Sequence, residues 1–355
     1  GHDALTETVT QIINSDVDLV VQGGDLFHGS IPSVRGIVHI REQFDRFYRA
    51  GIPLIGITGN HDYPNTRLRL PATASVNDPE HNLHIYTEPF VRLNPADGIV
   101  LHAVGHAGLL GTPVEPMPVD GAVNILVSHG AADIEGHEIF HCVDSPAEAV
   151  IPRATLEQDF NVTLLGHYHG QGALPKLRGT TNQAYYAGSA LRRGFSDSAG
   201  DRGWLLVEIE SNGEVKVIPQ KIHQRPQYDL PMVDASGLSG AEVEELIRTN
   251  LRNIDFSDSP IVRQRVVECA LPTRRGVDSK ALNEISAEAL AWQLEFQRPV
   301  ESEQQVVGID GIRHAKKVSL PEAWKEFLAS DTSLTEGQKQ MLAEQGRALL
   351  EGDAK

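Results

Sequence analysis

The chain has 355 residues, of which 40% are hydrophobic and 22% charged, a composition typical of folded proteins and not of disordered or fibrous ones. Its 31 basic and 48 acidic residues give a net charge of −17, which excludes a protein that coats nucleic acid or membrane through its overall charge. Two separate cysteines exclude a disulfide scaffold, and no apolar run approaches the ~20 residues of a membrane-spanning helix. The polar start has no signal-peptide segment, and the two separate cysteines fit a reducing compartment, so we expect a cytoplasmic location and no membrane partner.

Helical and strand patterns alternate through the first part of the chain. Residues 4–13 have a helical period, residues 17–21 form a short apolar strand, and residues 33–49 are helical again, ended by Gly51. A second apolar strand follows at 52–57, and such near-continuous apolar strands predict an α/β sheet buried on both faces. Further strands are predicted at 83–86, 99–104, 123–127, 162–165 and 185–187, and a hairpin at 204–209 and 215–218.

The pattern changes near residue 231 and again near residue 300. We predict one domain over 1–230, and a small α+β domain over 231–300 with helices at 240–252 and 278–294 and a strand at 261–267. Residues 301–355 form a charged tail with helical segments at 323–328 and 336–350. This tail has too little apolar surface to fold alone, so we expect it to dock on a partner.

Polar side chains capable of binding a metal follow four of the predicted strands. Asp25 follows the first strand, Asn60 and His61 follow the second, and His129, His167 and His169 follow two later ones. Ligand sites in open α/β sheets form where parallel strands end, so these side chains should converge. Each pattern alone is common in ordinary turns, but all four in this order favour a site for Mn²⁺, Fe or Zn²⁺.

These motifs resemble those of the calcineurin-like metallophosphoesterase superfamily, which are D-x-H, G-D, G-N-H-[DE], H and G-H-x-H in that order. Residues 24–28 (GDLFH), residues 59–62 (GNHD) and residues 186–189 (YAGS) with Arg192 or Arg193 are similar to those of SbcD-type DNA double-strand-break repair nucleases within it. The resemblance implies a two-sheet sandwich flanked by helices, followed by a small α+β cap domain and a helical tail.

The resemblance also implies a role for each site residue. Asp25 would bridge two divalent metals, expected to be Mn²⁺ with Mg²⁺ or Fe as alternatives, while Asn60, His129 and His167 complete one site and His169 binds the other. His61 would act as the general acid, oriented by Asp62. The residues expected to contact the substrate are His28, Arg67, Arg69, Arg192 and Arg193. A local basic patch over 174–202, with Lys176, Arg178 and Arg202, would receive the DNA backbone.

The first motif of the family, D-x-H, is missing from the sequence shown. His2 is placed 23 residues before Asp25, but no Asp precedes it by two positions, so we do not expect it to bind metal. We expect the motif to lie upstream of the sequence shown. The alternative is a protein that has kept a single metal site.

The leading hypothesis is a DNA exonuclease or endonuclease with two metals, acting in repair or a related pathway. The resemblance further implies an SMC-like ATPase partner of the SbcC type, bound through the tail, and a homodimer built on helix 33–49. Phe44, Phe47 and Tyr48 would form the dimer surface, unless these aromatics fill the core beneath the helix. The alternative functions are a metallophosphatase or cyclic-nucleotide phosphodiesterase of the same superfamily, and a degenerate scaffold without activity.

Overall fold

The computed structural model describes residues 2–63, 70–134, 149–176, 179–195, 197, 201–210, 212–299, 337 and 339–342. The chain divides into two compact units. The first comprises Gly1–Pro231, Arg248–Gln264 and Ser279–Leu294, and the second comprises Met232–Ile247, Arg265–Asp278 and Glu295–Lys355. The three domains expected from the sequence stay predictions. Among the described residues, no helix is long and apolar enough to cross a membrane.

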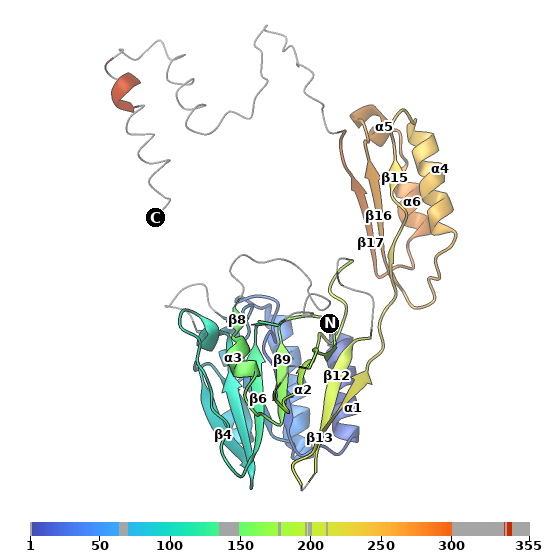
Figure 1. Cartoon of the computed structure of the whole chain (residues 1–355). Coiled ribbons are helices and arrows are strands. Elements are labelled where there is room, and N and C mark those ends of the chain that lie inside the picture. The colour runs from blue at the N-terminus through green and yellow to red at the C-terminus, as the bar shows by residue number, and fades with distance from the viewer. Residues whose placement is uncertain are drawn as a thin grey trace. The chain divides into compact units, whose positions relative to one another are not determined.

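The chain begins with a parallel three-stranded sheet covered by two helices. The elements are α1 (His2–Asn14), β1 (Val20–Gln22), α2 (Val34–Ala50), β2 (Leu54–Ile57) and β3 (Leu83–Tyr86), with strand order β1-β2-β3. The Ser33 side chain caps α2 by accepting from the Gly36 N–H, and Gly51 ends it with a φ of 73°. Apolar residues of both helices pack with those of the three strands in one core cluster. The helices therefore cover one face of this sheet (Figure 1).

A second sheet of six strands follows. Its order is β10 (Gly172–Ala173), β11 (Ala184–Tyr186), β9 (Val162–Gly166), β6 (Val123–His129), β5 (Ile99–Val104) and β4 (Val91–Ala96). The four inner strands are parallel, and both edge strands are antiparallel to their neighbours. A hairpin of β12 (Gly203–Ile209) and β13 (Val215–Lys221) forms a separate two-stranded sheet. The shorter elements are η1 (Ala72–Ser75), η2 (Pro79–His81), η3 (His106–Leu109), β7 (Ala131–Ala132), β8 (Val150–Ile151) and α3 (Arg153–Leu156).

Side chains alternate between two cores along the inner strands. On β6, Ile125 and Val127 pack in a cluster with Ile57 of β2 and residues of β12 and β13, which places this core between the sheets. Leu126 points to the opposite face, where it packs with Phe160 and other residues of a separate cluster. Because successive strand residues face opposite sides, both faces of the six-stranded sheet are covered. The expected mixed α/β sandwich is confirmed.

The aromatic residues of α2 lie in the core and not on the surface. Phe44 and Phe47 are 3% and 2% exposed and belong to the cluster beneath the helix. Tyr48 is 47% exposed, and its ring centroid lies 4.2 Å from that of His81. The aromatic dimer surface expected on this helix is therefore wrong for two of its three residues.

The remaining described elements form a four-stranded sheet with helices. They are β14 (Gln227–Asp229), β15 (Val233–Asp234), α4 (Gly240–Leu251), β16 (Ile261–Val267), α5 (Leu271–Arg275), α6 (Ser279–Ile285) and β17 (Ala291–Phe296). The helix predicted over 278–294 is wrong in its second half, because α6 ends at Ile285 and β17 pairs with β16. Trp292, Leu294 and Phe296 recur at every second position, which is a strand period. The predicted tail helices fall almost wholly outside the described residues. In the tail at 301–355, the structure describes only residues 337 and 339–342, and these are helical.

Candidate metal centre

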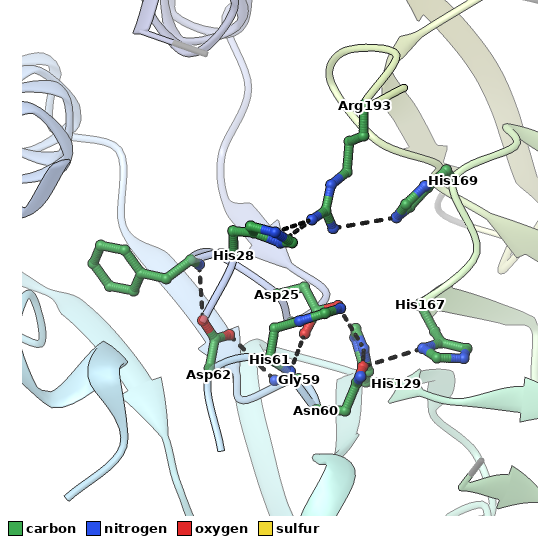
Figure 2. Close-up of polar contacts among 12 residues, drawn as sticks. Asp25, His28, Gly59, Asn60, His61, Asp62, His129, His167, His169 and Arg193 are labelled. Carbon is green, nitrogen blue, oxygen red and sulfur yellow. Dashed lines mark hydrogen bonds and ion pairs between the residues drawn. The ribbon is translucent and has the colours of Figure 1, made fainter. Parts of the chain in front are cut away.

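The site lies where four parallel strands end. Asp25 follows β1 and Asn60 follows β2 in the first sheet, while His129 ends β6 and His167 follows β9 in the second. His129 and Gly166 are register partners, so the ends of β6 and β9 are level. The side chains from all four loops converge on one another (Figure 2).

Three of these residues could hold one ion between them. Ligand atoms of Asp25, His129 and His167 all lie within 4.8 Å of one another. The Oδ1 atom of Asn60 lies 3.0 Å from His129 Nε2 and 3.2 Å from His167 Nδ1. The structure therefore brings together the four residues that were predicted to share one metal.

The arrangement of donor atoms fits a cation. The Nδ1–H of His129 donates to the Gly23 carbonyl at 2.7 Å, so its Nε2 carries a lone pair when the ring is neutral. That lone pair faces the Asn60 oxygen and also Asp25 Oδ2 at 3.4 Å. Electron-rich atoms that converge in this way repel each other unless a positive charge lies among them. Carboxylate, amide oxygen and imidazole donors suit Mn²⁺, Fe or Zn²⁺.

The charges in the site hold the carboxylate of Asp25 in its ionised form. Burial by itself raises the pKa of Asp25, but the hydrogen bonds and charges of His129 and His61 outweigh it and lower the pKa to about 2. Burial lowers the pKa of His129, and here the hydrogen bond and charge of Asp25 reverse the direction and raise it. His106 differs, because burial and the charge of His129 lower its pKa to about 4. The site thus holds an ionised carboxylate, and a bound metal would take the place of the proton that the raised pKa of His129 favours, because histidine binds a metal only in its neutral form.

Two of the candidate ligands have an unusual backbone conformation. Asp25 has a φ of 53° and His167 a φ of 105°, a region that residues other than glycine rarely adopt. Such a conformation costs about 1–3 kcal/mol for each residue and persists only where the surroundings enforce it. Here the preceding Gly24 also has a positive φ of 93°, so the chain turns sharply after β1 and directs Asp25 into the site.

Both carboxylate oxygens of Asp62 accept backbone N–H groups, and its role in orienting His61 stays a prediction. Its two carboxylate oxygens accept the backbone N–H groups of Leu26 at 3.0 Å, Phe27 at 2.8 Å and Gly59 at 3.3 Å (Figure 2). The carboxylate thus ties the loop after β1 to the loop after β2. Its burial and the nearby charge of Asp25 raise its pKa to about 6.

His61 and His28 lie side by side at the exposed side of the site. The His61 backbone N–H donates to Asp25 Oδ1 at 2.9 Å, and its Nε2 lies 4.0 Å from Asp25 Oδ2. The ring centroids of His28 and His61 are 5.3 Å apart. The side chain of His61 is 37% exposed, so a substrate can reach it.

The structure separates the predicted arginines. The exposed Arg193 extends between His28 and His169, with its Nη2 3.1 Å from His28 Nε2 and its Nη1 3.4 Å from His169 Nε2 (Figure 2). Arg192 instead donates to the Phe195 carbonyl in its own loop at 3.3 Å. Arg202 is 2% exposed and hydrogen-bonds the His169 carbonyl, so it does not belong to a surface patch. Arg67, Arg69 and Arg178 lie outside the described residues.

His169 lies beside the cluster and has a partner that the motif analysis did not identify. Its Nδ1 is 3.0 Å from Asp197 Oδ1 and 3.2 Å from Oδ2. Asp197 stands 28 residues later in the sequence, in a Phe-Ser-Asp segment with no motif of its own. Only its position two residues after Phe195, behind the two arginines, could have suggested it.

Comparison with known proteins gives a consistent picture. Residues 1–171 match the family of calcineurin-like phosphoesterases. The chain is 28% identical over 295 residues to the DNA double-strand break repair protein Mre11 of Haloferax volcanii, covering 79% of this chain and 59% of that protein. It is 24% identical over 247 residues to the D component of the nuclease SbcCD of Staphylococcus saprophyticus, covering 62% and 61%. The resemblance inferred from the motifs is confirmed.

Two further matches are shorter or weaker. Over 50 residues, 14% of this chain and 11% of that protein, the chain is 44% identical to the Mre11 protein of Archaeoglobus fulgidus. The solved structure of TT1561 from Thermus thermophilus aligns with 61% of this chain and 92% of that one, at 14% identity and a TM-score of 0.37, too low to carry an argument. The chain spans about 60% of the length of the first three curated relatives.

Proposed function

We propose, from the premise that residues 1–171 of this chain form a calcineurin-like phosphoesterase domain, that the protein is a metal-dependent phosphodiesterase that cleaves DNA. One observation carries the proposal: Asp25, Asn60, His129 and His167 come from four different strand ends and meet within hydrogen-bonding and ion-pair distance. Asp62 already links the loops after β1 and β2, and this set adds side chains from the ends of β6 and β9.

The residues of this chain would divide the work as follows. Asp25, Asn60, His129 and His167 would hold one divalent metal, and Asp25 and His169 would contribute to a second. A divalent metal, when bound, supplies Lewis-acid activation of the phosphodiester. The lowered pKa of Asp25 keeps its carboxylate available for this task down to acidic pH.

His61 is placed to act as the general acid. Its backbone is anchored on Asp25 by the 2.9 Å hydrogen bond, while its ring stays partly exposed next to His28. A proton held on this ring would pass to the oxygen that leaves the phosphorus. Arg193, with His28, would contact the non-bridging oxygens of the phosphate, since a guanidinium matches them geometrically.

DNA is the proposed substrate because the relatives are named as DNA double-strand break repair proteins and as parts of a nuclease. The net charge of −17 would oppose binding of a polyanion, so local cations such as Arg193 must compensate. We place the activity, as an exonuclease or an endonuclease, in DNA repair or a related DNA-processing pathway.

A second protein and a second copy are proposed as partners. The staphylococcal relative is named as one component of a larger nuclease, SbcCD, which supports a partner of the SbcC type for the tail at 301–355. For the second copy, the start of α2 offers an apolar surface of Ile31, Val34 and Leu70, which are 75%, 77% and 80% exposed. A cavity of about 300 Å³ adjoins this surface, lined by residues 32, 37, 70–72, 74 and 75. This surface replaces the buried aromatics as the proposed dimer contact.

The proposal is tested by cleavage of plasmid DNA and of a short single strand with Mn²⁺ or Mg²⁺. A small chromogenic phosphodiester is assayed in parallel, with Asp25→Asn as the inactive control. We expect metal-dependent cleavage of DNA that the variant lacks. Cleavage of the small diester alone would favour a small-molecule phosphodiesterase, and no cleavage of either with metal bound would favour a scaffold.

A further inference from the structure

His169 and Asp197 form a buried pair next to the metal centre. The exposed fractions of the two side chains are 17% and 5%, and Nδ1 of the histidine contacts both carboxylate oxygens, at 3.0 and 3.2 Å. A carboxylate can only accept, so the hydrogen of this bond lies on Nδ1. The bond therefore selects the tautomer of His169 in which Nε2 carries the lone pair.

The opposite nitrogen of the ring faces the site. Nε2 of His169 lies 3.4 Å from Nη1 of Arg193, whose guanidinium also contacts His28 (Figure 2). The guanidinium has donors and no acceptor, so it too requires a lone pair on Nε2. Asp197 and Arg193 thus favour the same tautomer, and of these two residues Asp197 is the buried one.

The backbone of His169 is held separately from its side chain. Its carbonyl accepts from the Ser189 N–H at 3.1 Å and from the buried Arg202. These two bonds hold the main chain of His169 independently of Asp197, whose carboxylate contacts only the ring, at Nδ1.

Asp197 also makes a second hydrogen bond, and the competing explanation is that the residue only stabilises the turn that carries Arg193. Its Oδ2 accepts the Arg193 backbone N–H at 2.9 Å and so closes the turn that carries this arginine. Burial alone raises the pKa of Asp197, but the hydrogen bonds of His169 and Arg193 and nearby charges lower it, so the carboxylate is ionised near neutral pH. If Asp197 had a purely structural role, its bond to the Arg193 backbone N–H would be sufficient.

We propose that Asp197 is a positioning residue that fixes the tautomer and ring orientation of His169, so that Nε2 faces the cation and phosphate side of the site. This inference rests on the proposed function. Replacing a carboxylate that orients a metal-binding histidine typically lowers the metal affinity or the activity by about 10- to 100-fold. Asp197→Asn should weaken Mn²⁺ binding at the position served by His169 by about this factor.

The matched control is a second Asp–His pair outside the site. Asp78 Oδ2 lies 2.8 Å from His81 Nδ1, an equivalent contact between residues that are not candidate ligands. Asp78→Asn should leave Mn²⁺ binding unchanged. Asp197→Glu keeps the charge and should recover part of the affinity that Asp197→Asn loses.

The decisive measurement is a double-mutant cycle on Mn²⁺ affinity by calorimetry, using the whole chain with Asp197→Asn, His169→Ala and both. If Asp197 acts through His169, Asp197→Asn causes no further loss once His169 is removed. Equal losses in both backgrounds would overturn the proposal and leave Asp197 as a holder of the turn.

A spectroscopic readout separates this test from the proposed function. Nitrogen-15 NMR of the imidazoles in metal-free protein, assigned through His169→Gln, should show Nδ1–H and an unprotonated Nε2 in the neutral ring of His169. A mixture of tautomers should appear in Asp197→Asn. The reverse tautomer in the unmodified chain would overturn the proposal even if metal binds, and absence of Mn²⁺ binding with the expected tautomer would instead contradict the proposed function.

Discussion

Gly59→Ala tests the geometry of the metal centre without altering any candidate ligand. A Cβ at this position would lie 2.1 Å from Asp25 Oδ1 and 2.3 Å from the Asp25 backbone nitrogen. Ordinary contact begins near 3.4 Å, so atoms must move by about 1.3 Å. Rotation of the Asp25 side chain cannot relieve the overlap with its backbone nitrogen, and the loop after β1 has to shift.

The expected effect follows from the tolerance of metal sites. Ligand distances must stay within about 0.2 Å of their preferred values, and the required displacement is several times larger. We expect Mn²⁺ affinity to fall by at least tenfold, or about 1.4 kcal/mol. The overlap should also lower the free energy of unfolding by about 1–3 kcal/mol, the usual cost of overpacking.

The assay compares Mn²⁺ binding by calorimetry and thermal unfolding with and without Mn²⁺. Gly29→Ala is the matched control, because a Cβ at that position meets nothing within 4 Å. The control should keep its affinity and the stabilisation that bound metal gives. If folded Gly59→Ala bound Mn²⁺ as tightly as the unmodified chain, Asp25 would not be a ligand in the arrangement described.

Three other predictions follow from the same structure. His61→Asn should leave metal content nearly unchanged and slow cleavage by roughly 10²–10⁴, whereas Asp25→Asn should lose metal as well; equal metal loss in both would contradict the separation of roles. Phe47→Glu should give an unfolded or insoluble chain, since Phe47 is 2% exposed, while Leu70→Glu, at an 80% exposed position, should fold and be monomeric by light scattering if the apolar surface joins two copies. The raised pKa of Asp62, about 6 against 3.8, means that its contribution to stability is complete below pH 3.8 and lost as pH rises through 6. Between pH 3.8 and pH 6, denaturant titrations should show the free energy of unfolding of the unmodified chain falling by up to about 3 kcal/mol relative to that of Asp62→Asn. If the two free energies differed by the same amount at every pH, the raised pKa of Asp62 would be refuted.

The sequence alone located the ends of the four strands that carry the site to within two residues, and it identified the residues that meet there. The predicted bounds of β3, β5 and β16 agree with the structure at both ends. A strand that is buried on both faces has a short apolar run, and a strand that is buried on one face alternates apolar and polar residues, so both are distinct in the sequence. Parallel strands end at one edge of a sheet, so the sequence predicted that Asp25, Asn60, His129 and His167 lie together, as they do in the structure.

Contacts between segments far apart in the sequence were decided only by the tertiary structure. Asp62 bonds to backbone groups 35 and 36 residues away, and Asp197 pairs with a histidine 28 residues before it. The local sequence does not predict such partners, because an aspartate occurs equally in a turn, on the surface or beside an imidazole.

Burial of ambiguous side chains was likewise decided by packing. The helical spacing of Phe47 is compatible both with a core position and with an interface, and in the structure this residue is buried. Arg202 was predicted to belong to a surface patch, but it is buried and hydrogen-bonds the His169 carbonyl. The predicted helix over 278–294 extended into residues 291–294, but pairing with β16 gives the backbone groups of this segment partners and makes it a strand. In each case the local sequence permits two structures, and the energy of contacts from elsewhere in the chain selects one.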